Sequence, residues 1–158
     1  MDIFIGKIIN FIALEMQVFL VAALPVVELR GAIPLGIAEG MDPFAAAAVS
    51  IAGSMLPVPF ILLFMKPVFT RMRGSGTGVK IVDALTNRTK RRAEKIKKYS
   101  AYGLVLFVAI PLPSTGVWTG AMAASIFNVP VKRAFYAILI GDCIAAMIVM
   151  MLSNAIII

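Results

Sequence analysis

The lengths of its uncharged segments are the feature of this sequence that most limits how the chain can fold. Residues 43–65 and 134–158 are apolar runs of 23 and 25 residues, and only Asp142 interrupts the second. An α-helix rises about 1.5 Å per residue, so either run covers the roughly 30 Å hydrocarbon core of a bilayer. We therefore predict two membrane-spanning helices, over 43–65 and 134–158.

The composition supports a membrane protein. Of 158 residues, 61% are hydrophobic and 15% charged, whereas soluble domains average about 45–50% apolar and about 25% charged residues. A soluble fold of this length leaves much of its surface wet and has no room to bury so much apolar area. We predict an all-α integral membrane protein with a single membrane domain over 1–158, which excludes a disulfide-rich secreted protein and a disordered chain.

Residues 99–131 form a third uncharged run, whose length fits no simple crossing. As one helix its 33 residues would measure about 50 Å, which is too long for one pass and too short for two. Its middle, residues 110–120, contains two prolines and two glycines, which argue against an unbroken helix. We predict two half-helices forming a re-entrant hairpin over 99–127.

A second re-entrant hairpin is predicted over residues 17–40. The uncharged run 16–27 has only 12 residues and ends at Glu28 and Arg30, and Pro34 follows closely. We expect the helix to break in this charged middle part. A charged pair at membrane depth is costly unless it faces a cavity or a partner, so we expect protein to cover it.

The two halves of the chain have matching landmarks. Each half contains a proline after an apolar run, a proline that opens the following span, and a glycine-polar pair within that span. The offsets are 86, 87 and 88 residues, for Pro25 and Pro111, for Pro43 and Pro130, and for Gly53-Ser54 and Gly141-Asp142. We predict inverted repeats over 1–65 and 99–158. Whether residues 1–16 span the membrane or lie on it stays open.

Residues 66–98 separate the two halves and hold most of the positive charge. Eleven Lys/Arg and two acidic residues lie there. Because positive loops stay on the cytoplasmic side, we expect a cytoplasmic loop, with an amphipathic helix over 79–98. The same charge also fits binding of anionic lipid or of partner proteins. The lack of aromatic residues between Arg71 and Lys98 argues against nucleic acid as a partner.

The sequence lacks the side chains of several chemistries. It contains no His, and Cys143 is its single cysteine. Imidazole proton shuttles, His metal ligands and Ser-His-Asp triads are therefore excluded. We expect no enzyme activity, no bound metal and no cofactor.

Two segments carry a resemblance to a known family: Leu24–Pro34, which reads LPVVELRGAIP, and Pro111–Gly120, which reads PLPSTGVWTG. With them the chain resembles the small multidrug export protein family of prokaryotic membrane proteins, which is similar to the DedA/VTT superfamily. The resemblance implies an inverted-repeat carrier in the plasma (inner) membrane of a prokaryote. Proton-dependent transport and translocation of lipid-linked phosphates are the roles suggested for the DedA relatives. Unlike their second hairpin, that of this chain carries no charge.

Glu28 and Arg30 are the first candidates for functional groups. A buried Glu28 balanced by Arg30 is suited to take up and release a proton during transport. Arg30 also matches the geometry of a phosphate or carboxylate head group, and we expect half-helices around Gly31 and Gly116 to present free N–H groups beside it. Alternatively, Glu28 and Arg30 only pair to hold the hairpins together.

The other candidate substrate- or ion-binding residues lie in the broken segments or within a span. We predict a carrier, coupled to a proton or Na⁺, for an amphipathic or anionic solute such as a phosphate-headed lipid or a drug-like compound. The alternative is a non-transporting scaffold that acts through the basic loop. Membrane lipids and a second copy of the chain are the expected partners. The further candidates are Gly31, Pro34, Pro111, Pro113, Ser114, Thr115, Gly116, Trp118, Thr119 and Asp142.

Overall fold

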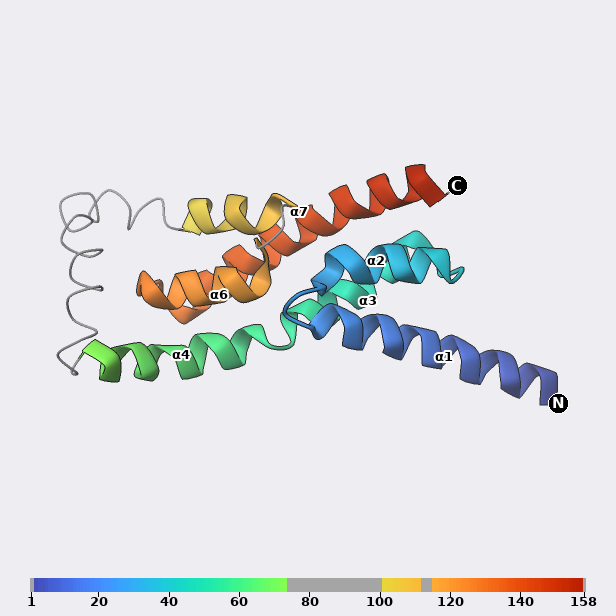
Figure 1. Ribbon diagram of the computed structural model, residues 1–158, viewed down its shortest axis with the longest axis horizontal. Coiled ribbons are helices and arrows are strands. Elements are labelled where there is room, and N and C mark those ends of the chain that lie inside the picture. Colours follow the sequence, from blue (N-terminus) through green and yellow to red (C-terminus); the bar gives the residue numbers. More distant parts are fainter. Residues whose placement is uncertain (1, 74–100, 112–114, 158) are drawn as a thin grey trace.

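The computed structural model describes residues 2–73, 101–111 and 115–157, and every regular element in these ranges is a helix. The predicted all-helical fold is confirmed. In chain order (Figure 1) the helices are α1 (Asp2–Ala23), α2 (Glu28–Ala38), α3 (Pro43–Met55), α4 (Val58–Arg73), a helix over residues 101–109, α6 (Val117–Ile126) and α7 (Val131–Ile157).

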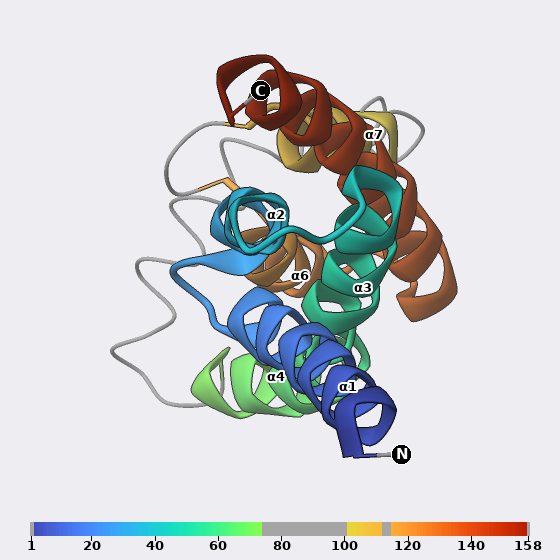
Figure 2. The same cartoon turned by 90° about the vertical axis from the view of Figure 1, so that its right-hand side faces the viewer.

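The helices form two groups along the long axis of the molecule. α1, α2 and α3 pack on one another toward one end, while α4, the helix over 101–109 and α6 pack together toward the other (Figure 1). α7 contacts both groups, since it packs against α2 and α3 as well as α4 and α6. The view along the long axis shows α2 in front of α6 (Figure 2), so the two short helices lie nearly end to end.

α1 is one continuous helix from Asp2 to Ala23. The boundary expected at residue 17, between a lead-in and the first hairpin, therefore falls inside it. No proline precedes Pro25, and helical geometry is disfavoured for the residue before a proline, which agrees with a helix that ends just before this position.

α2 contains the charged segment that we expected to be broken. The break lies earlier, at residues 24–27, and Glu28 to Ala38 are helical with Pro34 inside. Because Pro34 has no N–H, it leaves the Arg30 carbonyl without its helical partner but does not end this short helix. With 11 residues α2 is about 16 Å long, and α6 with 10 is about 15 Å, about half of a bilayer core each.

Within the described ranges, two stretches are long and apolar enough to cross a membrane. They are Pro43–Met65, as predicted, and Val131–Ile156, which begins at Val131 rather than at Ala134. The first stretch is interrupted between α3 and α4, at Leu56 and Pro57, where a proline cannot continue the helical hydrogen bonds. The basic segment starts within α4, and its residues 74–98, including the predicted amphipathic helix, lie outside the described residues.

α2 and α6 end in the same kind of turn. Gly40 and Asn128, 88 residues apart, have φ of 90° and 54°, the left-handed conformation that glycine and asparagine favour after a helix. The next residue closes each turn: Met41 N donates to the Gly36 carbonyl at 2.8 Å, and Val129 N to the Ala124 carbonyl at 2.9 Å.

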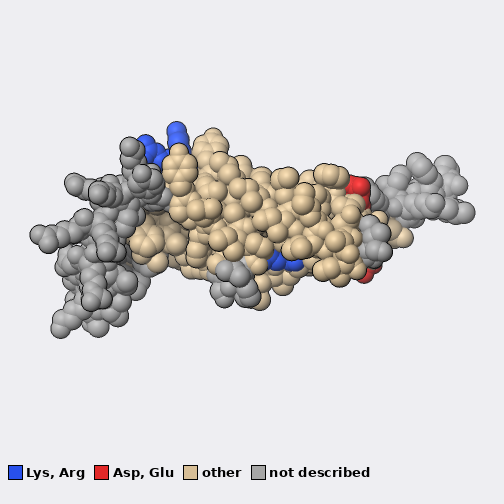
Figure 3. Space-filling model, turned by 90° about the horizontal axis from the view of Figure 1, so that it is seen from above, with Lys and Arg blue, Asp and Glu red and all other residues tan. Residues whose placement is uncertain are grey.

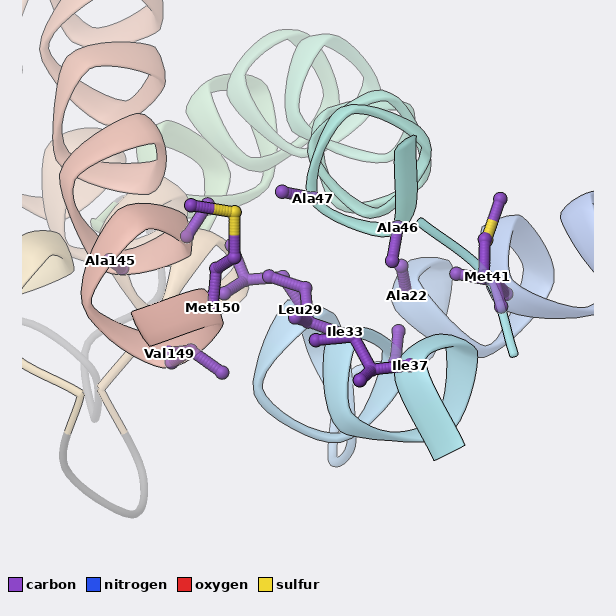
Figure 4. Packing of buried hydrophobic residues seen from close by; sticks show 13 residues of the cluster. Ala22, Leu29, Ile33, Ile37, Met41, Ala46, Ala47, Ala145, Val149 and Met150 are labelled. Atoms are coloured by element: carbon purple, nitrogen blue, oxygen red, sulfur yellow. The ribbon is translucent and has the colours of Figure 1, made fainter. Parts of the chain in front are cut away.

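Buried apolar side chains form one cluster in each group of helices. In the first, Leu29, Ile33 and Ile37 of α2 point toward α3 and α7 (Figure 4), and alanines on those helices allow close packing. The second cluster joins α4, the helix over 101–109 and α6 to the first half of α7. The outer surface is also apolar, with large exposed side chains such as Leu20, Phe60, Leu106, Ile140 and Met147.

Charged residues gather at the two ends of the molecule. Figure 3 shows acidic atoms at one end and basic atoms at the other, with a mostly uncharged middle. The exposed acids Glu39 and Asp42 lie between α2 and α3, whereas Arg71, Lys132 and Arg133 lie near the end of α4 and the start of α7. A broad uncharged belt between charged ends is what a membrane protein requires.

Candidate functional site

Three helix ends meet where the two groups of helices join. They are the N-termini of α2 and α6 and the C-terminal end of the helix over 101–109 (Figure 1). Each end of a helix leaves backbone N–H or carbonyl groups without helical partners. In an apolar environment such groups need other partners, and two charged side chains supply them. We call this place the junction.

Glu28 caps α6 from outside that helix. Its side chain is buried, and it accepts hydrogen bonds from Trp118 N at 3.3 Å and from Arg30 Nη1 at 2.8 Å. Trp118 N is one of the unpaired donors in the first turn of α6, where the helix dipole favours an anion. Glu28 has φ of 49°, a conformation that costs a residue other than glycine about 1–3 kcal/mol. The contacts at the junction offset this cost.

Arg30 caps a C-terminal helix end, that of the helix over 101–109. Its Nη2 lies 3.4 Å from the Val108 carbonyl, 3.2 Å from the Ile110 carbonyl and 3.3 Å from Thr115 Oγ1. Thr115 Oγ1 in turn donates to the Ile110 carbonyl at 2.8 Å. A cation is favoured at the C-terminal end of a helix. The Glu28–Arg30 pair therefore places a negative charge at the start of α6 and a positive charge at the end of the preceding helix.

Gly116 makes room for the Glu28 carboxylate. It is the N-cap residue of α6, and a Cβ at this position would overlap the carboxylate oxygens of Glu28. Next to it, Trp118 Nε1 donates to the Ala23 carbonyl at 3.3 Å, at the C-terminal end of α1. α1 is thus tied to the same junction.

Asp142 forms a second buried polar contact. Its side chain is buried between α7 and α3, and its Oδ2 lies 2.6 Å from Ser54 Oγ. Ser54 also lies 3.0 Å from the Ile51 carbonyl. This partner of Asp142 lies 88 residues away in sequence. Matching positions of the Gly53-Ser54 and Gly141-Asp142 pairs were the sequence signal for this contact.

The structure brings together part of the predicted set. Glu28, Arg30, Thr115, Gly116 and Trp118 meet at the junction, whereas Asp142 pairs with Ser54. Thr119 Oγ1 donates to the Gly116 carbonyl at 3.3 Å, within its own helix. Pro34 lies inside α2, Pro111 follows the helix over 101–109, and Pro113 and Ser114 lie outside the described residues.

The expected free N–H groups are not free. Gly31 lies inside α2, and its N–H donates to the Val27 carbonyl at 3.2 Å, because α2 starts at Glu28 rather than at the glycine. At α6 the Glu28 carboxylate occupies the position where we expected an anionic ligand. The carbonyls of Val108 and Ile110 and the backbone N–H of Trp118 complete the junction, and side-chain patterns do not reveal them.

In the described ranges, no three His, Cys, Asp or Glu residues are close enough to hold a metal ion.

In the part of the chain that the structure describes, two apolar stretches of spanning length, an apolar outer surface and a largely buried ion pair between helix ends indicate a small helical membrane protein. The sequence model of the family described as "Putative small multi-drug export protein" matches residues 28–148, and the chain belongs to this family. The predicted resemblance to the small multidrug export family is confirmed. Comparisons with curated proteins and with solved structures gave no match. The family suggests a membrane transporter rather than an enzyme.

Proposed function

We propose that this protein is an ion-coupled carrier for an amphipathic solute and that the junction is its binding and gating site. The observation that carries the proposal is the ion pair between the buried Glu28 and the partly buried Arg30, which bridges helix ends from both halves of the chain. A continuous helical bundle needs no such pair. Interrupted helices around buried charges are typical of transporters, whose binding sites lie near the middle of the membrane.

We also propose that the chain consists of two inverted repeats, each with a re-entrant hairpin and a spanning helix. Support comes from equivalent features 88 residues apart: the turns at Gly40 and Asn128, and the polar contact between Ser54 and Asp142. α3 and α7 run in opposite directions along the long axis (Figure 1). In each hairpin one short helix follows a preceding helix: α2 follows α1, and α6 follows the helix over 101–109. The N-termini of α2 and α6 face each other (Figure 1). Such a repeat also agrees with the proposed relation to the DedA/VTT superfamily.

Arg30 and α6 suggest how a cargo with an anionic head group would bind. Arg30 Nε is buried and has no hydrogen-bond partner, while Nη1 and Nη2 hold Glu28 and the neighbouring helix end. A phosphate or carboxylate group would therefore compete with the Glu28 carboxylate for Arg30 and for the first N–H groups of α6. In this scheme the ion pair closes the junction, and cargo binding replaces one of its contacts.

Transport by reconstituted protein tests the proposal. The probes are a fluorescent phospholipid with an anionic head group, followed by its movement between leaflets, and a fluorescent amphipathic dye, followed by its uptake. We expect Glu28→Gln and Arg30→Ala each to slow transport of at least one probe by about tenfold or more, since each leaves a buried partner uncompensated.

The exposed residues Glu39 and Arg71 provide matched controls. Glu39→Gln and Arg71→Ala remove the same kinds of charge at the two ends of the molecule, and both are expected to transport like the wild type. The proposal fails if folded Glu28→Gln and Arg30→Ala proteins transport both probes at the wild-type rate. Absence of transport by the wild-type protein would also contradict it.

A further inference from the structure

Asp142 is a buried carboxyl that the junction does not use. The Glu28 carboxyl group accepts hydrogen bonds from Arg30 Nη1 and Trp118 N, and its ion pair with Arg30 favours its ionised form. Among the described residues, Asp142 has one hydrogen-bonding neighbour, the hydroxyl of Ser54. The two carboxyls therefore lie in contrasting environments, an arrangement that separates an ionised group from a protonated one.

The single hydrogen of the Ser54 hydroxyl group indicates the protonation state of Asp142. Ser54 Oγ lies 3.0 Å from the Ile51 carbonyl and 2.6 Å from Asp142 Oδ2, and both distances are those of hydrogen bonds. A hydroxyl group has one hydrogen and can fully donate to one of these oxygens. A carbonyl cannot donate. Both contacts are satisfied when Ser54 donates to the Ile51 carbonyl and a protonated Asp142 donates to Ser54.

The charges around Asp142 also favour its protonated form. Glu28 and Arg30 neutralise each other at 2.8 Å, and they are the charged groups that act on Asp142 from α2. The contacting α3 offers hydroxyls only, α6 has no ionisable residue, and α4 carries its charged residues in its second half. An ionised Asp142 would thus be an unbalanced negative charge inside a membrane protein, which is costly.

We infer that the Asp142–Ser54 contact between α7 and α3 is the proton-binding site of this protein, separate from the ion pair at the junction. Asp142 holds a proton in the conformation described here, and Ser54 accepts the hydrogen bond from it. The contact joins the two proposed repeats, because α3 and α7 each supply one member. Loss of the proton removes this donor and introduces a charge next to the junction. The role in coupling rests on the proposed function, whereas the protonation state does not.

Infrared spectroscopy of the purified protein in an ester-free detergent tests the protonation state. A protonated carboxyl group has a carbonyl band that neither a carboxylate nor an asparagine side chain shows. We expect this band at neutral pH in the wild type and in Glu28→Gln, and its loss in Asp142→Asn. The inference is overturned if the wild type lacks the band, or if Glu28→Gln removes it and Asp142→Asn does not.

Serine variants provide a test that leaves Asp142 in place. Ser54→Ala removes the partner and is expected to shift the frequency of the carbonyl band. Ser50→Ala is the matched control, because Ser50 lies one turn earlier on α3, is equally buried, and has no hydrogen-bond partner among the described residues. We expect its band to stay at the wild-type frequency. Equal spectra for both variants would contradict the assignment of Ser54.

The coupling role is tested separately in vesicles with an imposed pH gradient. Asp142→Asn keeps a neutral side chain at all pH values, so we expect it to lose gradient-driven accumulation of the amphipathic dye but to retain exchange without a gradient. Gradient-driven accumulation by Asp142→Asn would overturn the coupling role. A protonated Asp142 in a protein that transports neither probe would contradict the proposed function and leave the proton site standing.

Discussion

At the scale of single residues, the junction depends on one close approach. Glu28 reaches the first turn of α6 because Gly116 has no side chain, and a Cβ at Gly116 would overlap the carboxylate. The positive φ of Glu28 shows that the chain adopts an unfavourable backbone conformation to make this contact.

Gly116→Ala should therefore destabilise the protein by about 1–3 kcal/mol, the usual cost of forcing a methyl group into an occupied space. Thermal unfolding in detergent measures the effect. The same substitution in a Glu28→Ala background should cost much less, because the overlapping carboxylate is gone. If Gly116→Ala costs the same in both backgrounds, Glu28 and Gly116 are not in contact.

At the scale of elements, glycines set how closely the helices pack. Gly53 of α3 lies against the backbone of α1, where a Cβ would overlap the Phe19 carbonyl oxygen. Gly141 of α7 lies against the helix over 101–109, where a Cβ would be 2.7 Å from the Val105 carbonyl oxygen. Backbone atoms cannot rotate away as side chains do, so both glycines are needed for the observed packing.

Gly53→Ala and Gly141→Ala should each lower the unfolding temperature, and by similar amounts if the proposed repeats are equivalent. The expected cost is about 1–3 kcal/mol each. Gly103→Ala is the control, since Gly103 lies in the helix over 101–109 with open space around it. There the better helix propensity of alanine should leave stability unchanged or raise it by up to about 1 kcal/mol. Equal behaviour of all three variants would contradict the packing described for α3 and α7.

At the scale of the whole molecule, the charges indicate an orientation. Basic residues lie near the end of α4 and the start of α7, and the exposed acids Glu39 and Asp42 lie at the opposite end (Figure 3). Since positive segments stay in the cytoplasm, the basic end should face inward. The segment between the two halves, residues 74–98, is also rich in Lys and Arg, so we expect it on the same side of the membrane.

Labelling with a membrane-impermeant maleimide in intact cells checks this orientation. The native Cys143 is first replaced by alanine, and single cysteines are introduced as Lys132→Cys and Glu39→Cys. We expect the reagent to reach Glu39→Cys from outside and Lys132→Cys only after the cells are opened. The reverse pattern would mean that the basic end faces outward, and labelling of both in intact cells would contradict a fixed orientation.

Much of the fold could be predicted from the sequence, because the length of an uncharged segment and the effect of a proline on a helix are both local properties. They located Pro43–Met65, the second span to within a few residues, and the non-helical residues 110–111 and 115–116. They placed the first break too late, in the charged segment rather than at residues 24–27. Helix propensity could not decide where the first break lies, because Pro34, which disfavours a helix, is tolerated within α2.

By itself the sequence determined the two apolar spans, the concentration of basic charge in 66–98, and Glu28 and Arg30 as a charged pair in an otherwise apolar segment. Only the tertiary structure decided what that pair does. Arg30 reaches carbonyls 78 and 80 residues away, Glu28 caps a helix 90 residues away, and Ser54 meets Asp142 across 88 residues. The partners are backbone groups or depend on how two helices align. No local pattern records them, because they arise only when the two halves pack together.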